Sequence, residues 1–322
     1  MRLSLKGLVP ARLRRWLGGA PGDPLFHLLT EVVALGILAL LAAIVIVLFV
    51  GAGEAMRAFG PRFLTGSVWD PTPPEEFGAV PFVYGTLVTS AVALLLGVPV
   101  SLGIAIFLSE QAPPWIRTPL TFLVEVLAAV PSVVYGLWGI FVLAPGMRDT
   151  VEPALQSVFG FLPLFHGTPF GLDKLTAGVI LAIMVIPTIS AVSREALLAV
   201  PDSQREAALS LGATRWETTR LAVLRYARSG IFGATILGLG RAVGETMAVT
   251  MTIGNRNIVS VSLLDQGQTI ASWIANNFTE AQPLEVSALI ELGLVLMLLA
   301  LVINVVARLL VLRMFRVAEG VR

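Results

Sequence analysis

The stretch EAALSLG at residues 206–212 decides what kind of protein this sequence encodes. It lies between two long apolar stretches, and arginines stand on both sides of it. Apart from Glu206 and Ser210 it consists of small or aliphatic residues, and Gly212 closes it. A compact charged segment between apolar stretches has the character of a docking surface on a membrane protein.

The composition is that of an integral membrane protein. Of the 322 residues, 56% are hydrophobic and 13% are charged, and the mean hydropathy is +0.85, well outside the range of soluble globular domains. The net charge of +1 gives no indication of nucleic-acid binding. There is no cysteine, which excludes disulfides, thiolate metal sites and a cysteine nucleophile. The two histidines, His27 and His166, form no metal-binding or catalytic pattern.

Six apolar stretches are long enough to span a membrane, since a helix rises about 1.5 Å per residue and a span needs roughly 20 residues. They cover approximately residues 29–51, 82–108, 120–143, 175–193, 231–253 and 286–310. Of the Lys and Arg residues, 16 fall on one side of this arrangement and five on the other, and one lies within a span. By the positive-inside rule both termini and the loop before the fifth span are cytoplasmic.

The predicted organisation follows from these spans. The N-terminal arginines and the apolar run after them resemble a secretory signal, but the run is too long for one, so we expect it to remain as an uncleaved first span. We expect a basic cytoplasmic tail, a first span, an ordered external loop, a core with five spans and a cytoplasmic loop at 199–229, and a C-terminal cytoplasmic tail. The bounds of these parts are 1–28, 29–51, 52–81, 82–310 and 311–322.

The 199–229 loop carries two capping-box patterns around one glycine. Ser203 with Glu206 and Thr214 with Glu217 have the required spacing. Gly212 can adopt the left-handed conformation that ends a helix. We predict two short helices joined by a tight turn. The alternative is an ordinary amphipathic loop whose arginines hold it near anionic lipid headgroups, which does not require two caps.

This segment resembles the EAA loop of ABC-importer permeases, in which Glu-Ala-Ala is followed after three residues by Gly. The resemblance implies that the short helix docks in a groove of a cytoplasmic ATPase and transmits its closure to the spans. The residues that the resemblance assigns to this coupling are Glu206, Ala207, Ala208, Gly212, Arg215 and Trp216. One departure concerns the exit from the loop, where Arg225 stands in place of the usual proline.

Further stretches are similar to the phosphate-specific importer permeases of the PstC type. They are FLTGSVWDP at 63–71, PFVYGTL at 81–87, VPSVVYGLWG at 130–139, GLGRAVGETMA at 238–248 and TIASWIA at 269–275. The resemblance implies an all-α membrane protein with six transmembrane helices, the type I ABC-importer (MetI-like) fold and a place in a bacterial inner membrane. It implies as partners a homologous PstA-type permease, two ATPase subunits, a phosphate-binding protein, phosphate and lipids.

No enzymatic activity is expected of this chain. It contains no Gly-x-x-x-x-Gly-Lys-Ser/Thr segment, so ATP and magnesium are expected to bind to the partner ATPase. We expect no catalytic residue, no cofactor and no metal site in this chain.

Arg241 and Glu245 are the most informative charges within a span. Counted from Ile231, Arg241 lies about 15 Å into the fifth span, where a charge must be paired or face a polar cavity. Glu245 and Thr252 were predicted to continue the same helix face. On the functional interpretation, Arg241 donates to the passing phosphate and Glu245 modulates that charge. The alternative is a buried ion pair that fixes packing, with Glu125 of the third span as another partner.

Glu125 itself is expected either to line the inner vestibule or to pair with a helix end. Pro131 and Pro187 fall within two of the spans and can kink them.

Three alternative functions stay open from the sequence. A permease for sulfate or molybdate would differ in the anion that stimulates ATP hydrolysis. An ion-coupled carrier or channel would work without an ATPase. A membrane-embedded hydrolase is disfavoured because no Ser/His/Asp or metal cluster is present.

Overall fold

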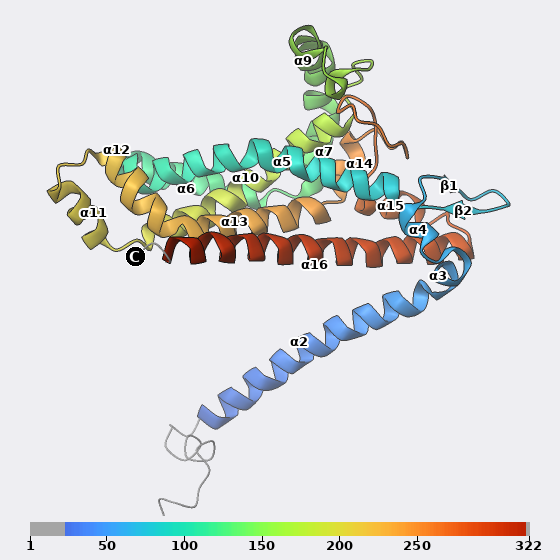
Figure 1. Cartoon of the computed structure of the whole chain (residues 1–322), viewed down its shortest axis with the longest axis horizontal. Helices are drawn as coiled ribbons and strands as arrows, with labels where there is room; N and C mark the ends of the chain where they lie inside the picture. Colours follow the sequence, from blue (N-terminus) through green and yellow to red (C-terminus); the bar gives the residue numbers. More distant parts are fainter. Residues whose placement is uncertain (1–22, 320–322) are drawn as a thin grey trace, which may run out of the picture. The chain divides into compact units, whose positions relative to one another are not determined.

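The computed structural model describes residues 23–319 (Figure 1). The chain forms two compact units that divide after Gly51. The first unit contains helix α2 (Asp23–Gly51), in which no side chain from Phe26 to Val50 is buried and most apolar ones are exposed. Six residues assigned above to the N-terminal tail therefore belong to this helix, and residues 1–22 lie outside the described part.

The second unit is a bundle of long helices with short elements at both ends. The long helices are α5 (Val80–Ile106), α6 (Pro114–Ala129), α10 (Lys174–Leu198), α13 (Leu224–Gly244) and α16 (Pro283–Glu319). The short ones are α3 (Gly53–Phe59), α4 (Arg62–Thr65), α7 (Ser132–Trp138), α8 (Ala144–Gly146), α9 (Glu152–Phe159), α11 (Asp202–Ser210), α12 (Arg215–Thr218), α14 (Met247–Thr252) and α15 (Ile270–Asn277). Four π-helical turns, η2 (Phe107–Gln111), η3 (Gly139–Leu143), η4 (Met147–Val151) and η6 (Thr219–Val223), the 3-10 turn η5 (Pro163–Phe165) and strands β1 (Trp69–Asp70) and β2 (Glu76–Phe77) complete it.

Helix α10 forms the centre of this unit. It packs against α5 and α13, and glycines permit close approach at these contacts. A Cβ on Gly178 would meet Val92 at 2.5 Å, and a Cβ on Gly238 would meet Ile189 at 2.5 Å. Small residues at such interfaces are typical of helix packing in membranes, where close van der Waals contact drives association.

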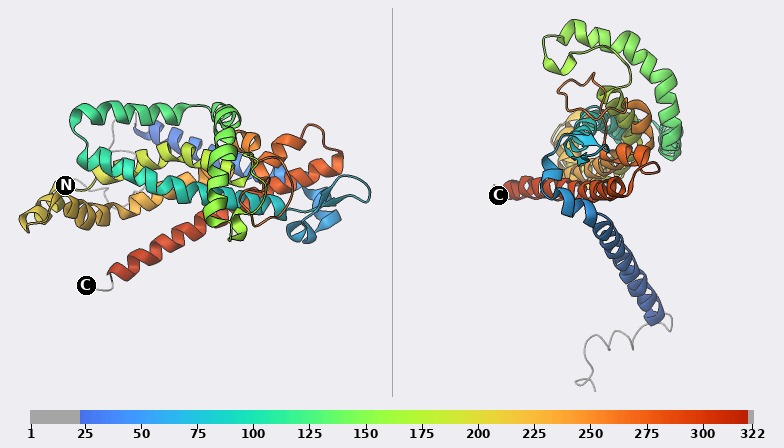
Figure 2. Two further views of the ribbon diagram at one scale, coloured as in Figure 1. Left: turned by 90° about the horizontal axis from the view of Figure 1, so that it is seen from above. Right: turned by 90° about the vertical axis from the view of Figure 1, so that its right-hand side faces the viewer.

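The helical membrane fold is confirmed, and the structure supports four or five of the six expected spans. Within the described residues, four helices are long and apolar enough to cross a membrane, namely α2, the α5–η2 helix, α10 and α16. A fifth span requires counting α6 together with the segment from α7 to α9, which is bent from it by 92° (Figure 2).

The third and fifth expected spans are not continuous helices, and this corrects the prediction. The third breaks at Val130, because proline disfavours the helical conformation of the residue before it, and Val130 has a ψ of 128°. The fifth breaks after Gly244, where Glu245 has a ψ of 127°. α13 is also rich in glycine and contains three arginines, so its role as a span remains a prediction. At the C-terminus α16 continues past residue 310 to Glu319.

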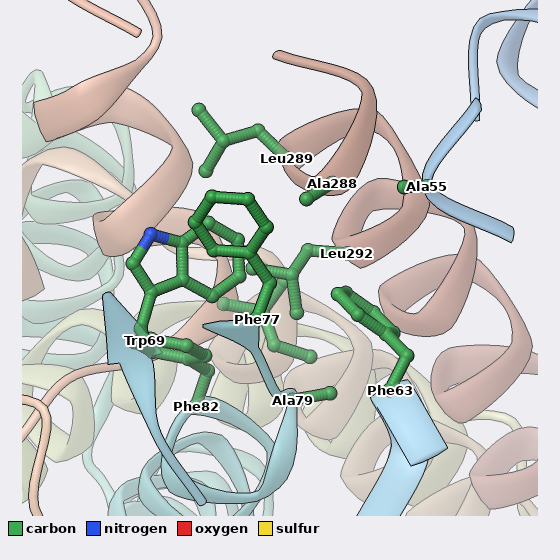
Figure 3. Close-up of a cluster of buried hydrophobic side chains, with 10 residues drawn as sticks. Ala55, Phe63, Trp69, Phe77, Ala79, Phe82, Ala288, Leu289 and Leu292 are labelled. Carbon is green, nitrogen blue, oxygen red and sulfur yellow. The ribbon is translucent and has the colours of Figure 1, made fainter. Parts of the chain in front are cut away.

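The expected loop at 52–81 is an ordered cap built around an aromatic cluster. Figure 3 shows Trp69 of β1 between Phe77 of β2 and Phe82 of α5, in one cluster with Leu289 and Leu292 of α16. The Trp69 and Phe82 rings lie 5.3 Å apart in an edge-to-face arrangement, which is the favoured geometry. Trp69 Nε1 donates to Glu285 Oε1 at 3.0 Å, so the buried indole has its hydrogen-bond partner. We call this end of the second unit the cap end.

Replacing Trp69 with Ala is expected to destabilise the protein strongly. Trp69 is 6% exposed, and removing a buried aromatic side chain costs about 3–5 kcal/mol. Thermal unfolding of the purified protein in detergent should show a clearly lower Tm. The matched control is Trp115→Ala on α6, because Trp115 is 76% exposed. Equal Tm values for the two variants would contradict the assignment of this cluster as a core.

A second apolar core closes the opposite end. It joins the last turns of α5 and α10 to the start of α13, through Ala105, Ile106, Leu197, Val200, Val223 and Ala227. The 199–229 loop leaves the bundle directly at this core, and we call this end the loop end. The core gives that loop a fixed base.

Candidate functional site

The first candidate site is the 199–229 loop, whose first helix is α11. Pro201 precedes it in an extended conformation with ψ 140°, and no side chain caps the helix. The predicted capping box of Ser203 with Glu206 is therefore wrong. With Ser203 as the N-cap the helix would begin at Gln204, whereas it begins two residues earlier, at Asp202, directly after Pro201. Ser203 therefore lies inside the first turn, because proline with its fixed φ is tolerated at a helix start.

The turn and the second helix agree with the prediction. Gly212 has a φ of 87°, the left-handed conformation that favours glycine. Thr214 and Glu217 form a complete capping box at the start of α12: Glu217 N donates to Thr214 Oγ1 at 3.3 Å, and Thr214 N donates to Glu217 Oε2 at 2.8 Å. That backbone hydrogen bond lowers the pKa of Glu217. Two short helices around Gly212 are thus confirmed.

The residues that the EAA resemblance singles out lie on the surface of this loop. Glu206, Ala207, Gly212, Arg215 and Trp216 are exposed, and Ala208 is half-buried. Trp216 is 54% exposed, and Leu211, which the sequence analysis did not select, is 89% exposed. A single exposed leucine is common on a protein surface, but this loop also exposes Trp216 and Leu209, the latter to 48%. The loop therefore presents an apolar tip within a polar surround.

Two hollows flank α11. One, of about 890 Å³, is lined by Ala207, Ala208 and Leu211 on one side and Arg225 and Tyr226 on the other. The second, of about 480 Å³, is lined by residues that include Glu110, Arg205, Arg215 and Trp216. Arg225, which stands in place of the usual proline, thus faces the first hollow. Helix α13 includes Arg225 and is not broken there.

Arg205 does not face outward as a headgroup-binding arginine would. Its guanidinium donates to Glu110 Oε1 at 2.9 Å, and this hydrogen bond is the main cause of the raised pKa of Arg205. No local pattern predicts this contact, because the two residues are 95 positions apart. The lipid-surface alternative therefore does not account for Arg205.

The second candidate site surrounds Arg241, in the last turn of α13. Arg241 is half-buried and lines an open cavity of about 550 Å³ with Thr188 of α10, Gly240 and Asn304 of α16. Its Nη1 donates to Thr188 Oγ1 at 3.4 Å, a long bond. A Cβ on Gly240 would meet nothing within 4 Å, so the cavity stays open beside the guanidinium. An anion can approach Arg241 from this side.

Glu245 does not share a helix face with Arg241, which corrects the prediction. The helix ends at Gly244, and Glu245 takes an extended conformation in the link to α14. There its Oε1 accepts a hydrogen bond from Ala248 N at 3.4 Å, so it supports the start of α14. Within the described residues no ion pair joins Arg241 to Glu245 or to Glu125. The alternative of an intrahelical ion pair is therefore wrong as well.

Glu125 and Thr252 lie away from the Arg241 cavity. Glu125 is exposed on α6 and lines a separate cavity of about 280 Å³ with Thr121, Ser190 and Arg194. Thr252 is wholly buried, and its hydroxyl donates to Ala248 O at 2.8 Å within α14. Thr252 therefore does not continue an open polar face as predicted, because the chain changes direction between α13 and α14. Asn304, by contrast, does line the Arg241 cavity.

Known proteins resemble this chain along most of its length. Residues 97–316 match the family described as binding-protein-dependent transport system inner membrane component. Proteins named phosphate transport system permease protein PstC are 45% identical over 296 residues in Mesorhizobium japonicum, covering 90% of each chain, and 47% identical over 307 residues in Xylella fastidiosa, covering 94% of each. A protein named as a probable PstC permease in Methanocaldococcus jannaschii is 37% identical, covering 80% of this chain and 84% of the relative.

Solved structures show the same fold at low sequence identity. A bacterial alginate ABC transporter aligns with a TM-score of 0.58 and 16% identity over 89% of this chain and 93% of its own. The MetNI methionine ABC transporter in an inward-facing conformation aligns with a TM-score of 0.55 and 18% identity over 72% of this chain and 94% of its own. At such identities the likeness concerns the arrangement of helices alone.

Proposed function

We propose that this chain, which belongs to the family of binding-protein-dependent transport system inner membrane components, forms half of the translocation pore of an ATP-driven phosphate importer. It is a multi-pass inner-membrane permease and not itself an ATPase. The assignment of phosphate as the substrate rests on one observation. The chain is 45–47% identical, over at least nine tenths of its length, to permeases named for phosphate transport.

The 199–229 loop is the docking site of the ATPase in this proposal. Its support is the combination of two short helices, a left-handed turn at Gly212 and exposed apolar side chains at Leu211 and Trp216. A rigid surface with an apolar tip and charges beside it, such as Glu206 and Arg215, suits a specific protein interface. Two ATPase subunits serve the importer, one at this loop and one at the equivalent loop of a homologous second permease.

Docking at this loop fixes the orientation of the chain. The loop end and the last part of α16 are cytoplasmic, and the cap end with α15 faces outward, where a phosphate-binding protein delivers the anion. The arginines of the N-terminal segment assign it to the cytoplasm by the positive-inside rule. This orientation agrees with the excess of Lys and Arg in the segments assigned to the cytoplasm.

Arg241 is the phosphate-binding residue of the pore in this proposal. It has one hydrogen-bonded side chain partner among the described residues, the Thr188 hydroxyl, so other guanidinium donors can bind a phosphate oxyanion. Thr188 and Asn304 add neutral polar groups to the cavity. One positive charge with neutral neighbours suits transport, because conduction requires binding that attracts the anion and still releases it.

The anion specificity distinguishes this function from a sulfate or molybdate permease. The complete complex, reconstituted with its ATPase and binding protein, is tested for ATP hydrolysis in the presence of each anion. We expect phosphate to stimulate hydrolysis when the binding protein is present, and sulfate and molybdate to leave it at the basal rate. Stimulation by sulfate or molybdate with no response to phosphate would assign the pore to the other anion.

A further inference from the structure

Arg205 uses every donor of its guanidinium at the loop end. Nε and Nη2 donate to the two carboxylate oxygens of Glu110, at 3.3 and 2.9 Å. Nη2 also donates to Leu197 O at 3.0 Å. Nη1 donates to Val200 O at 2.5 Å and to Asp202 Oδ1 at 3.2 Å. Five N–H groups therefore have five acceptors.

These acceptors belong to different structural elements. Glu110 lies in η2, the π-helical turn that ends the α5 helix. Leu197 and Val200 are at the end of α10 and belong to the apolar core of the loop end. Arg205 itself lies in the middle of α11. One side chain thus joins α11 to the ends of two long helices.

The contact with Glu110 differs from an ordinary surface ion pair. The Arg205 side chain is 20% exposed and that of Glu110 is 11% exposed, whereas exposed pairs contribute little. The arrangement is bidentate, which fits the planar guanidinium and cannot be reproduced by lysine. In addition, the positive charge lies at the C-terminal end of α10, where the helix dipole favours a cation.

Hydrophobic packing provides only a weak alternative anchor for α11, which lies against η6 and α12. No residue of this helix is buried, and its hydrogen bond to Asp202 is local, since Asp202 is 88% exposed. The connection from α10 to α11 is only three residues long, but its rotatable backbone bonds would let α11 change its angle to α10. Arg205 is therefore the main link between the orientation of α11 and that of α5 and α10.

We propose that Arg205 is a positioning residue that locks α11 to α5 and α10 through Glu110, Leu197 and Val200, so that movement imposed on α11 is carried into the membrane helices. The proposal rests on the proposed function of the 199–229 loop as the ATPase docking site. With the lock intact, α11 moves together with the loop-end core. Without it, α11 can tilt on its short connection while the core stays in place.

The lock is tested first by a distance measurement that does not depend on transport. This chain has no cysteine, so when it is labelled before assembly with its partners, nitroxides attach only at the introduced cysteines, Ser210→Cys on α11 and Leu95→Cys on α5. We expect a narrow distance distribution in the otherwise unchanged complex and a clearly broader one after Arg205→Lys or Glu110→Gln. A distribution that is equally narrow in these variants, or broad already without them, would overturn the lock.

The second measurement is the number of phosphate ions transported per ATP hydrolysed by the reconstituted complex. For Arg205→Lys and Glu110→Gln we expect normal assembly and continued ATP hydrolysis, with phosphate per ATP reduced about tenfold, the factor for one lost charge-assisted hydrogen bond. The double variant Glu110→Gln with Arg205→Lys should be no worse than Arg205→Lys alone, because Glu110→Gln removes a part of the interaction that Arg205→Lys already removes.

Asp202→Asn is the matched control, since it alters the exposed contact of Arg205 and leaves the buried ones. It should keep the normal ratio of phosphate to ATP. The proposal would be overturned if Arg205→Lys and Glu110→Gln both kept the normal ratio of phosphate to ATP. It would also be overturned if the reductions of this ratio in the two single variants added in the double variant. A wrong assignment of the 199–229 loop as the docking site would give a different result. The unaltered complex would then not bind the ATPase through this loop, whatever the distance measurement gives.

Discussion

Replacing Arg241 with Gln is expected to abolish phosphate uptake while the complex still assembles. The guanidinium is the positive charge that lines the open cavity between α10, α13 and α16. Removing a charge-assisted hydrogen bond costs about 1.5–3 kcal/mol, and each 1.4 kcal/mol is a factor of about ten. Uptake should therefore fall about 10- to 100-fold or more. The assay is labelled phosphate uptake by proteoliposomes that contain the complete complex.

Two matched variants separate charge from structure in this experiment. Arg241→Lys keeps the positive charge and should retain part of the uptake. Arg148→Gln removes an arginine from an exposed ion pair with Asp149, and such pairs contribute little, so uptake should stay normal. Normal uptake in Arg241→Gln would show that this arginine is not on the path of the anion.

Replacing Leu211 with Asp is expected to prevent ATPase binding without unfolding the permease. Leu211 is 89% exposed, so the free chain loses almost no packing. On docking, burial of a leucine side chain contributes about 1.5–3 kcal/mol, and an aspartate in the same place adds an unpaired charge to the interface. The amount of ATPase that copurifies with the permease should fall about 10- to 100-fold.

Leu211→Met is the control for this variant, because methionine keeps the apolar surface. It should retain the ATPase and transport phosphate. The thermal stability of the permease alone should be the same for Leu211→Asp and the unaltered chain. If Leu211→Asp copurifies with the ATPase at the normal ratio, the apolar tip is not part of the docking surface.

Local sequence signals predicted the 199–229 loop well. Gly212 and the Thr214–Glu217 box depend on contacts within a few residues, so their pattern is sufficient. The Ser203–Glu206 box has the same spacing and does not form, since the preceding proline starts the helix earlier. Even a local motif therefore depends on its immediate neighbour.

The two prolines show how tertiary packing decides the course of a span. Pro187 is buried within α10, which stays continuous between α5 and α13. Pro131 follows α6, a helix that buries none of its side chains, and there the chain bends by 92°. Both prolines give the same signal in the sequence. The difference lies in the neighbouring helices, which hydropathy does not reveal.

The candidate pore residues show the same limit. Arg241 was found because a charge in an apolar stretch is costly and rare. A shared helix face for Arg241 and Glu245 requires an unbroken helix, whereas α13 ends at Gly244. Asn304 lines the cavity from another helix, and Glu110 meets Arg205 across 95 residues. Contacts between residues so far apart in the sequence can be identified only once the fold is known.

The most direct test of the central claim is accumulation of labelled phosphate in proteoliposomes containing the complete complex. The account predicts accumulation against a gradient that requires the binding protein and ATP hydrolysis, and that stops when the ATPase subunits are replaced by a variant unable to hydrolyse ATP. Accumulation by this chain without any ATPase, driven by a proton or sodium gradient, would contradict the account and identify an ion-coupled carrier.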